Sequence, residues 1–282
     1  MCDDVCFTDL NRREFGALAL VAGAVAASPV RADVALTETD VEIKTPDGTA
    51  DAVFTHPAAG THPGVLVWTD IMGLRPAFRD MGRRLAAEGY AVLTPNPFYR
   101  SGKVSRDGLG LSFQDPAARA KMMQLMGALT APGAAERDAA AYTAWLDAQP
   151  QVKTAAKLGT TGYCMGGPLI MRTAAHLPDR IGAAASFHGG GLVTDKPESP
   201  HLMIPKMKAR FLIAIASDDD AKQPDAKNVL KAAFAAARLN AEIEVYEGAK
   251  HGWCVPGSPV HNPAQADRAF ARLLALFKMA LA

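Results

Sequence analysis

Short apolar runs alternate with amphipathic segments along the chain from residue 39 onward. Continuous apolar runs that end in polar residues indicate strands buried on both faces, whereas apolar residues at helical spacing indicate helices. This pattern predicts strands at residues 39–45, 50–57, 63–70, 90–98, 155–164, 181–189, 209–217 and 241–248. It predicts helices at 75–89, 134–149, 168–177, 224–239 and 263–281, and a loop with one further helix at 99–132.

The alternation of strands and helices favours the α/β class, with a doubly wound, mainly parallel sheet and helices on both faces. In such sheets the reactive groups gather beyond the carboxyl ends of the strands. The candidate functional residues are therefore those that directly follow the apolar runs: Asp70, Ile71, Tyr99, Arg100, Cys164, Met165, His188, Asp218, Asp219, Asp220 and His251.

Composition agrees with a globular domain and narrows the range of partners. Of the 282 residues, 49% are hydrophobic, and 30 basic against 29 acidic residues leave a formal net charge of +1. A single large α/β domain reaches this length. Since no block of like charge stands out, we expect neither nucleic acid nor an anionic membrane surface as a partner. As a separate expectation, the protein is a monomer. The histidines share no metal-ligand spacing, so we expect no metal and no cofactor.

The first 32 residues differ from the rest of the chain. Arg12 and Arg13 precede an uncharged apolar stretch, and small residues then lead to Ala32, as at a signal peptidase site. Paired arginines in this position are typical of the twin-arginine route. We predict an export signal at 1–32, passage through the twin-arginine machinery, and a periplasmic mature domain at 33–282. The stretch is too short for a membrane anchor; the alternative is an amphipathic helix that caps the domain.

Cys164 lies in the pattern Gly-x-Cys-x-Gly-Gly at a predicted strand-to-helix corner. Such a corner lifts one side chain out of the sheet, and its glycines leave room for the tight turn. Carboxylates at 218–220 and then His251 follow, in the order acid then base of α/β-hydrolases. The alternative interpretation is an inert buried cysteine. For Cys254 we expect packing and a free thiol.

These residues resemble the dienelactone hydrolase family, a branch of the α/β-hydrolase fold with a cysteine nucleophile. The resemblance rests on "GYCMGG", "YEGAKHGW", "WTDIMGLRPAFRDMGRRLAAEGYAVLTPNPFYR" and the acidic end of a strand. It implies that Cys164 is the nucleophile, His251 the base and Asp219 the orienting carboxylate. Asp218 and Asp220 remain alternatives for the acid, or they are solvated or helix-capping residues.

The resemblance also implies further roles around the nucleophile. Asp70 stands where the family has an acidic residue that pairs with the resting thiol; its alternative role is to cap the helix at 75–89. The backbone N–H groups of Ile71 and Met165 are expected to form the oxyanion hole, which is usually a large catalytic contribution.

Three residues are expected to contact the substrate. Arg100, next to Tyr99, matches a family arginine that holds a substrate carboxylate; its alternative is a surface arginine. Trp253 stands near the position of a second such arginine and is expected to make the pocket flatter and more apolar.

The stretch "HGGG" from His188 follows the cysteine, whereas the similar lipase motif precedes the nucleophile, so we interpret it as a strand exit.

The sequence therefore predicts a carboxylic ester hydrolase that cleaves a small ester or lactone through a Cys-His-Asp triad and an acyl-enzyme. A broader carboxylesterase or thioesterase is the alternative within enzymes. A catalytically silent periplasmic binding protein on the same scaffold is the alternative from another class.

Overall fold

Eight strands form one sheet in the computed structural model, which describes residues 34–281. In spatial order the strands are β1 (Leu36–Thr45), β2 (Gly48–Pro57), β4 (Ala91–Pro95), β3 (Gly64–Trp68), β5 (Leu158–Tyr163), β6 (Ile181–Phe187), β7 (Arg210–Ala216) and β8 (Ala241–Tyr246). The pairs β1–β2 and β2–β4 are antiparallel, and the other neighbours are parallel. The predicted export signal lies outside the described residues and stays a prediction.

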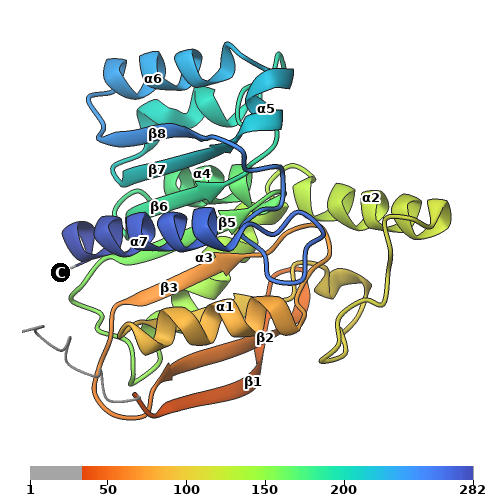
Figure 1. The fold of residues 1–282 in the computed structure, drawn as a ribbon. Helices are drawn as coiled ribbons and strands as arrows, with labels where there is room; N and C mark the ends of the chain where they lie inside the picture. The colour runs from red at the N-terminus through yellow and green to blue at the C-terminus, as the bar shows by residue number, and fades with distance from the viewer. Residues whose placement is uncertain (1–33, 282) are drawn as a thin grey trace, which may run out of the picture. The chain divides into compact units, whose positions relative to one another are not determined.

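Helices cover both faces of the sheet (Figure 1). One face carries α1 (Pro76–Ala87) and α7 (Pro263–Ala280), and the other carries α3 (Ala134–Asp147), α4 (Gly166–His176) and α6 (Ala226–Ala236). At the edge where the parallel strands end, α2 (Pro116–Thr130) extends outward and α5 (Ser217–Lys222) follows β7. Within residues 34–281, no helix is both long enough and apolar enough to cross a membrane.

The predicted doubly wound, mainly parallel sheet is confirmed, and the differences from the predicted elements are local. The first strand starts three residues earlier than predicted, at Leu36, and β5 is confined to Leu158–Tyr163. The sequence pattern missed α5 and a 3-10 turn at Pro200–Lys206. Both are too short to show a helical period of apolar residues, so the pattern could not reveal them.

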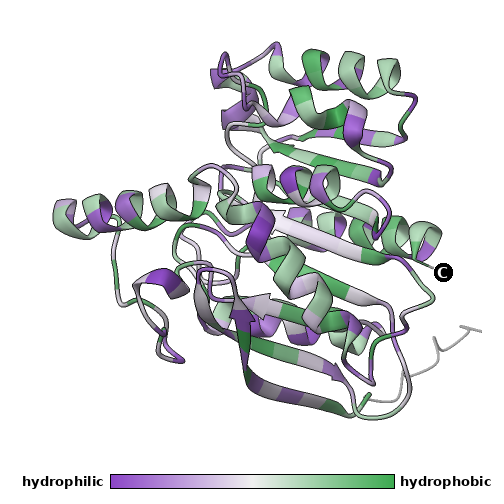
Figure 2. Ribbon diagram, turned by 180° about the vertical axis from the view of Figure 1, so that it is seen from behind, coloured by the Kyte–Doolittle hydropathy of each residue, from purple (hydrophilic) through white to green (hydrophobic). Residues whose placement is uncertain are grey.

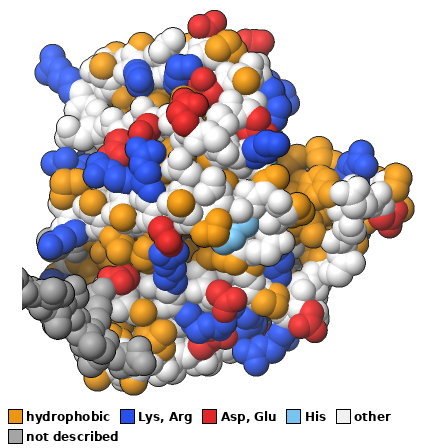
Figure 3. Space-filling model, in the orientation of Figure 1, with side chains coloured by type: hydrophobic (Ala, Val, Ile, Leu, Met, Phe, Trp, Pro, Cys, Tyr) orange, Lys and Arg blue, Asp and Glu red, His pale blue; other side chains and the backbone are white. Residues whose placement is uncertain are grey.

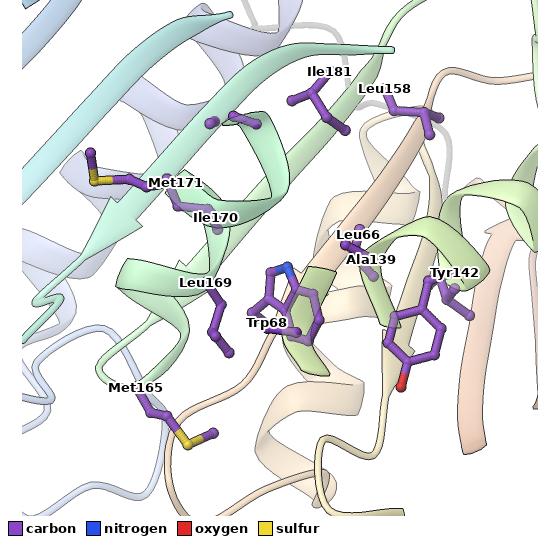
Figure 4. Packing of buried hydrophobic residues seen from close by; sticks show 14 of the residues in the cluster. Leu66, Trp68, Ala139, Tyr142, Leu158, Met165, Leu169, Ile170, Met171 and Ile181 are labelled. Atoms are coloured by element: carbon purple, nitrogen blue, oxygen red, sulfur yellow. The ribbon is translucent and has the colours of Figure 1, made fainter. Parts of the chain in front are cut away.

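Two apolar layers fill the space between the sheet and its helices. In β3, Val65 and Val67 belong to the layer beside α1 and α7, whereas Leu66 and Trp68 belong to the layer beside α3 and α4. Successive strand residues point to opposite faces, so a strand covered on both sides is apolar throughout. Figure 4 shows Trp68 near Tyr142, and their ring centroids are 5.8 Å apart. Figure 2 shows hydrophobic colour on several strands of the sheet, beside a paler central strand.

A buried ion pair ties the β1–β2 hairpin to α3. Asp138 is fully buried and accepts two hydrogen bonds of 2.8 Å from Arg100 and one of 2.7 Å from the hydroxyl of Tyr99. Arg100 also donates to Asp47 in the turn between the two strands, at 2.6 Å. On the exposed side, Arg137 donates to the same Asp47 carboxylate at 2.8 Å.

Asp138→Ala should lower the free energy of unfolding by about 3 kcal/mol, because it removes the buried partner of Arg100, whose guanidinium group then keeps only Asp47. Arg137→Ala is the matched control, since exposed ion pairs contribute little. Urea unfolding followed by circular dichroism measures both variants. Equal losses for the two variants would contradict a special role for the buried carboxylate.

Candidate active site

Cys164 lies at a sharp corner between β5 and α4. Its φ of 51° falls in the left-handed region, which residues with a side chain adopt only rarely. Glycines make the corner sterically possible. A Cβ on Gly162 would overlap the backbone of Gly166, and a Cβ on Gly166 would overlap the carbonyl oxygen of Trp68. The thiol is therefore held out of the sheet at the start of a helix.

His251 connects the thiol to a carboxylate. It lies in the loop after β8, and its Nδ1 atom is 2.6 Å from Oδ2 of Asp219. The Cys164 thiol lies in the same cavity wall as His251 and is one of the groups that raise the pKa of its imidazole. Because Nδ1 faces Asp219, we assign the contact with the thiol to Nε2. The structure thus brings together the three residues that the sequence predicted as nucleophile, base and acid.

The three consecutive aspartates after β7 have different partners. Asp218 accepts the backbone N–H of His251 at 2.8 Å, and Asp220 pairs with Lys227 at 2.7 and 2.8 Å. Asp219 contacts the imidazole ring itself. Of the three carboxylates, the geometry therefore favours Asp219 as the partner of the histidine side chain.

The surroundings of His251 favour its charged form. Burial opposes the charge, but the hydrogen bond with Asp219 and the interaction with Cys164 outweigh burial and raise the pKa of His251 to about 10. Burial likewise opposes ionisation of Asp219, yet hydrogen bonds from His251 and Lys222 lower the pKa of that carboxyl group. At neutral pH the site therefore holds a protonated imidazole beside the thiol.

His188 lies against the same corner, which the strand-exit interpretation of "HGGG" did not predict. Its Nδ1 atom accepts the backbone N–H of Cys164 at 3.1 Å, and its ring centroid lies 5.1 Å from that of His251. Burial, followed by the charge of His251, lowers the pKa of His188 to about 3, so its ring is neutral at neutral pH. A sequence signal existed: His188 directly follows a strand and precedes three glycines.

A cavity of about 700 Å³ opens at this corner. Cys164, His188 and His251 lie in its wall, and the segments 111–114 and 255–259 form much of the rest. The volume falls within the range of small-molecule sites. Among residues 34–281, no three His, Cys, Asp or Glu side chains are grouped as ligands of a metal ion.

The two residues predicted to form an oxyanion hole follow β3 and the nucleophile. Ile71 lines the cavity. Met165 comes directly after Cys164, and its side chain lies in the core near Leu169, as Figure 4 shows. Their backbone roles stay a prediction.

Asp70 lines the cavity, but its partner is an arginine. Arg75 binds it with both terminal nitrogens, at 2.7 and 2.8 Å, and the backbone N–H of Met72 donates to Oδ1 at 2.9 Å. The carboxylate is therefore engaged by Arg75 and by the backbone of Met72. Asp70 does not cap the helix either. The N-cap residue of α1 is Arg75, and its side chain forms no capping hydrogen bond. The sequence pattern gave no indication that Arg75 would be the partner of Asp70.

Arg100 and Tyr99 do not reach the cavity wall, contrary to the prediction that they contact the substrate. Both are held by Asp138, and Arg100 also by Asp47. The guanidinium group that was expected to bind a substrate carboxylate is already bound to two carboxylates of the protein.

Trp253 likewise lies behind the cavity rather than in its wall. Gly252 has a φ of 103° and turns the chain so that the indole enters the core, where it is fully buried. The ring stacks on Tyr246 with a centroid distance of 5.2 Å and meets His188 edge to face. Cys254, which was predicted to be a packing residue, is buried and its thiol is free.

Comparison with known proteins identifies the family. The sequence model of the dienelactone hydrolase family matches residues 50–281. The chain belongs to the dienelactone hydrolase family. The "Putative carboxymethylenebutenolidase" of Escherichia coli (strain K12) is 28% identical over 225 residues, 78% of this chain and 78% of the relative. A protein of the same name from Methylorubrum extorquens is 29% identical over 286 residues, 96% of this chain and 94% of the relative.

Solved structures of the family agree with the observed fold. The crystal structure of a "Putative Dienelactone Hydrolase" from Klebsiella pneumoniae subsp. pneumoniae superposes with a TM-score of 0.74 at 26% identity, covering 86% of this chain and 99% of that chain. The α/β-hydrolase fold is therefore confirmed. Membership of the dienelactone hydrolase family makes the protein a carboxylic ester hydrolase, which acts on esters or lactones.

Gly162→Ala should destabilise the corner by about 1–3 kcal/mol, the usual effect of overpacking. Gly127→Ala is the matched control: no atom lies within 4 Å of its added Cβ, and helical alanine is more stable than glycine by about 0.5–1 kcal/mol. Thermal unfolding compares the two variants. A stable Gly162→Ala protein with unchanged unfolding would contradict the close approach of β5 and α4.

His251 should titrate near pH 10 rather than near its ordinary value of 6.5. Its charged form then contributes to folding stability fully below pH 6.5, and this contribution is lost as the pH rises through about 10. Nitrogen NMR of labelled histidine follows the ring, and His251→Gln assigns its signal. The stability difference between wild type and His251→Gln should shrink over the same range; a midpoint near 6.5 would contradict the hydrogen-bonded pair.

Proposed function

We propose that the protein hydrolyses a carboxylic ester or lactone through an acyl-enzyme on Cys164. The observation that carries the proposal is the position of His251, which is hydrogen-bonded to Asp219 and lies with Cys164 in the wall of a substrate-sized cavity. A nucleophile in contact with a base, and a base oriented by a third group, is the arrangement of covalent catalysis.

Acylation starts from the thiolate of Cys164 and the protonated ring of His251. The sulfur attacks the carbonyl carbon, and the negative charge moves to the carbonyl oxygen of a tetrahedral intermediate. When this intermediate collapses, the bond to the leaving oxygen breaks, and Nε2–H of His251 protonates that oxygen. An alcohol departs, or the ring of a lactone opens, and a thioester with a neutral imidazole remains.

Deacylation reverses the proton transfer. Neutral His251 accepts a proton from water as the water oxygen attacks the thioester carbon. The carbon–sulfur bond then breaks, the carboxylic acid leaves, and the thiolate and the charged imidazole are restored. Throughout the cycle, Asp219 holds Nδ1–H of His251 and so keeps Nε2 directed at the reacting atoms.

The developing oxyanion needs fixed donors. We assign this role to the backbone N–H groups of Ile71 and Met165, since Ile71 lines the cavity and Met165 directly follows the nucleophile at the start of α4. Donors that are already in place cost little reorganisation when the charge forms.

Purified wild-type protein should hydrolyse 4-nitrophenyl acetate, and Cys164→Ser should lose most of this activity, because a hydroxyl is far less acidic than a thiol.

Asp219→Asn should lower kcat by roughly 10²–10⁴-fold, the contribution of a positioned acid–base system. Asp220→Asn removes the neighbouring carboxylate that pairs with Lys227, and it should leave kcat close to wild type. Absence of turnover on every short ester and lactone would instead favour the silent binding protein.

A further inference from the structure

We propose that the cavity selects neutral esters or lactones and discriminates against substrates that carry a carboxylate. This inference rests on the proposed function for the reacting group. The new part concerns the charge of the rest of the substrate. The ion pairs in and around the cavity determine whether that part is neutral or carries a carboxylate.

The arginine in the cavity wall is already saturated. Arg75 forms two parallel hydrogen bonds with Asp70 and a third with the carbonyl oxygen of Gly73, at 3.1 Å. Its guanidinium group also lies over the ring of Phe78, 4.9 Å from the centroid. A two-pronged arginine–carboxylate pair is the geometry by which proteins hold a carboxylate ligand, and here Asp70 occupies it.

The pair is also sheltered from water. The side chains of Arg75 and Asp70 are 20% and 13% exposed. Asp70 is held in place by the backbone N–H of Met72, so the carboxylate is anchored independently of the arginine. A substrate carboxylate would have to displace this neighbour while lying close to its negative charge.

The second arginine that the sequence suggested for carboxylate binding is equally engaged. Arg100 binds Asp138 and Asp47, and it lies outside the cavity wall. In the wall itself, the charge of His251 is balanced by Asp219. Each of these cations therefore has its own anion within the protein.

The rest of the cavity favours apolar groups. Its wall includes Ile71, Met72, Leu111, Phe113, Val255 and Pro256. In Figure 3, hydrophobic side chains gather over α2, which follows the segment 111–114 at the cavity. A carboxylate transferred from water to such a surface loses its hydration without a counterion, which is costly, whereas a neutral ester of similar shape loses little.

The test compares two substrates that differ in one group: 4-nitrophenyl hydrogen heptanedioate, which carries a free carboxylate, and its methyl ester. Wild type should show a kcat/KM for the methyl ester that exceeds that for the acid by about tenfold or more, the effect of one uncompensated charge contact. Equal values, or a preference for the acid, would overturn the inference.

Variants of Asp70 and Arg75 test whether their ion pair causes the selectivity against the acid. Asp70→Asn keeps the acceptor for Met72 N–H but releases Arg75, so the acid-to-ester ratio of kcat/KM should rise roughly tenfold to hundredfold. Asp70→Asn combined with Arg75→Gln removes the released cation and should return the ratio toward wild type. If Arg75→Gln alone selectively lowered activity on the acid, Arg75 would already bind substrate carboxylates and the inference would fall.

Binding measurements test the selection by charge separately from the proposed hydrolysis. Calorimetry with Cys164→Ala measures the affinity for both heptanedioates without hydrolysis. Tighter binding of the methyl ester supports charge selection even if wild type turns over neither compound, in which case the proposed function fails alone. Tighter binding of the acid overturns charge selection and leaves the hydrolytic function intact.

Discussion

The close approach of two backbone segments at the end of β5 is the constraint on which the site depends. Gly162 and Gly166 pass each other with no room for a Cβ, and this contact turns the chain so sharply that Cys164 takes a positive φ. His188 also stabilises this strained corner, because the Nδ1 atom of its neutral ring accepts the backbone N–H of Cys164. A thiol in this position faces the cavity instead of the core.

The parallel sheet supplies the remaining groups. Cys164, His188, Asp219 and His251 directly or closely follow β5, β6, β7 and β8, and the carboxyl ends of neighbouring parallel strands meet at one edge. Apolar layers on both faces fix the positions of these strands. Residues separated by almost 90 positions in the chain thereby meet at one site.

Compensation of charge within the protein shapes the surroundings of this group. Arg75 binds Asp70, and Arg100 binds Asp138, so both guanidinium groups have a partner before any ligand arrives. The same rule applies to His251, whose charge is stabilised by Asp219. Buried charges require partners, and here those partners leave an apolar cavity around a reactive pair.

The sequence by itself determined the α/β class, the order of the strands along the chain and the corner at Cys164, because these follow from apolar periodicity and from glycines at fixed spacing. It also placed Asp219 and His251 at strand ends and favoured Asp219 as the acid, with Asp218 and Asp220 as alternatives. Only the tertiary structure decided which carboxylate meets the imidazole, that Arg100 and Trp253 lie outside the cavity, and that Asp70 belongs to Arg75. Such pairings depend on where loops direct side chains of different segments, and a linear pattern carries no information on those directions.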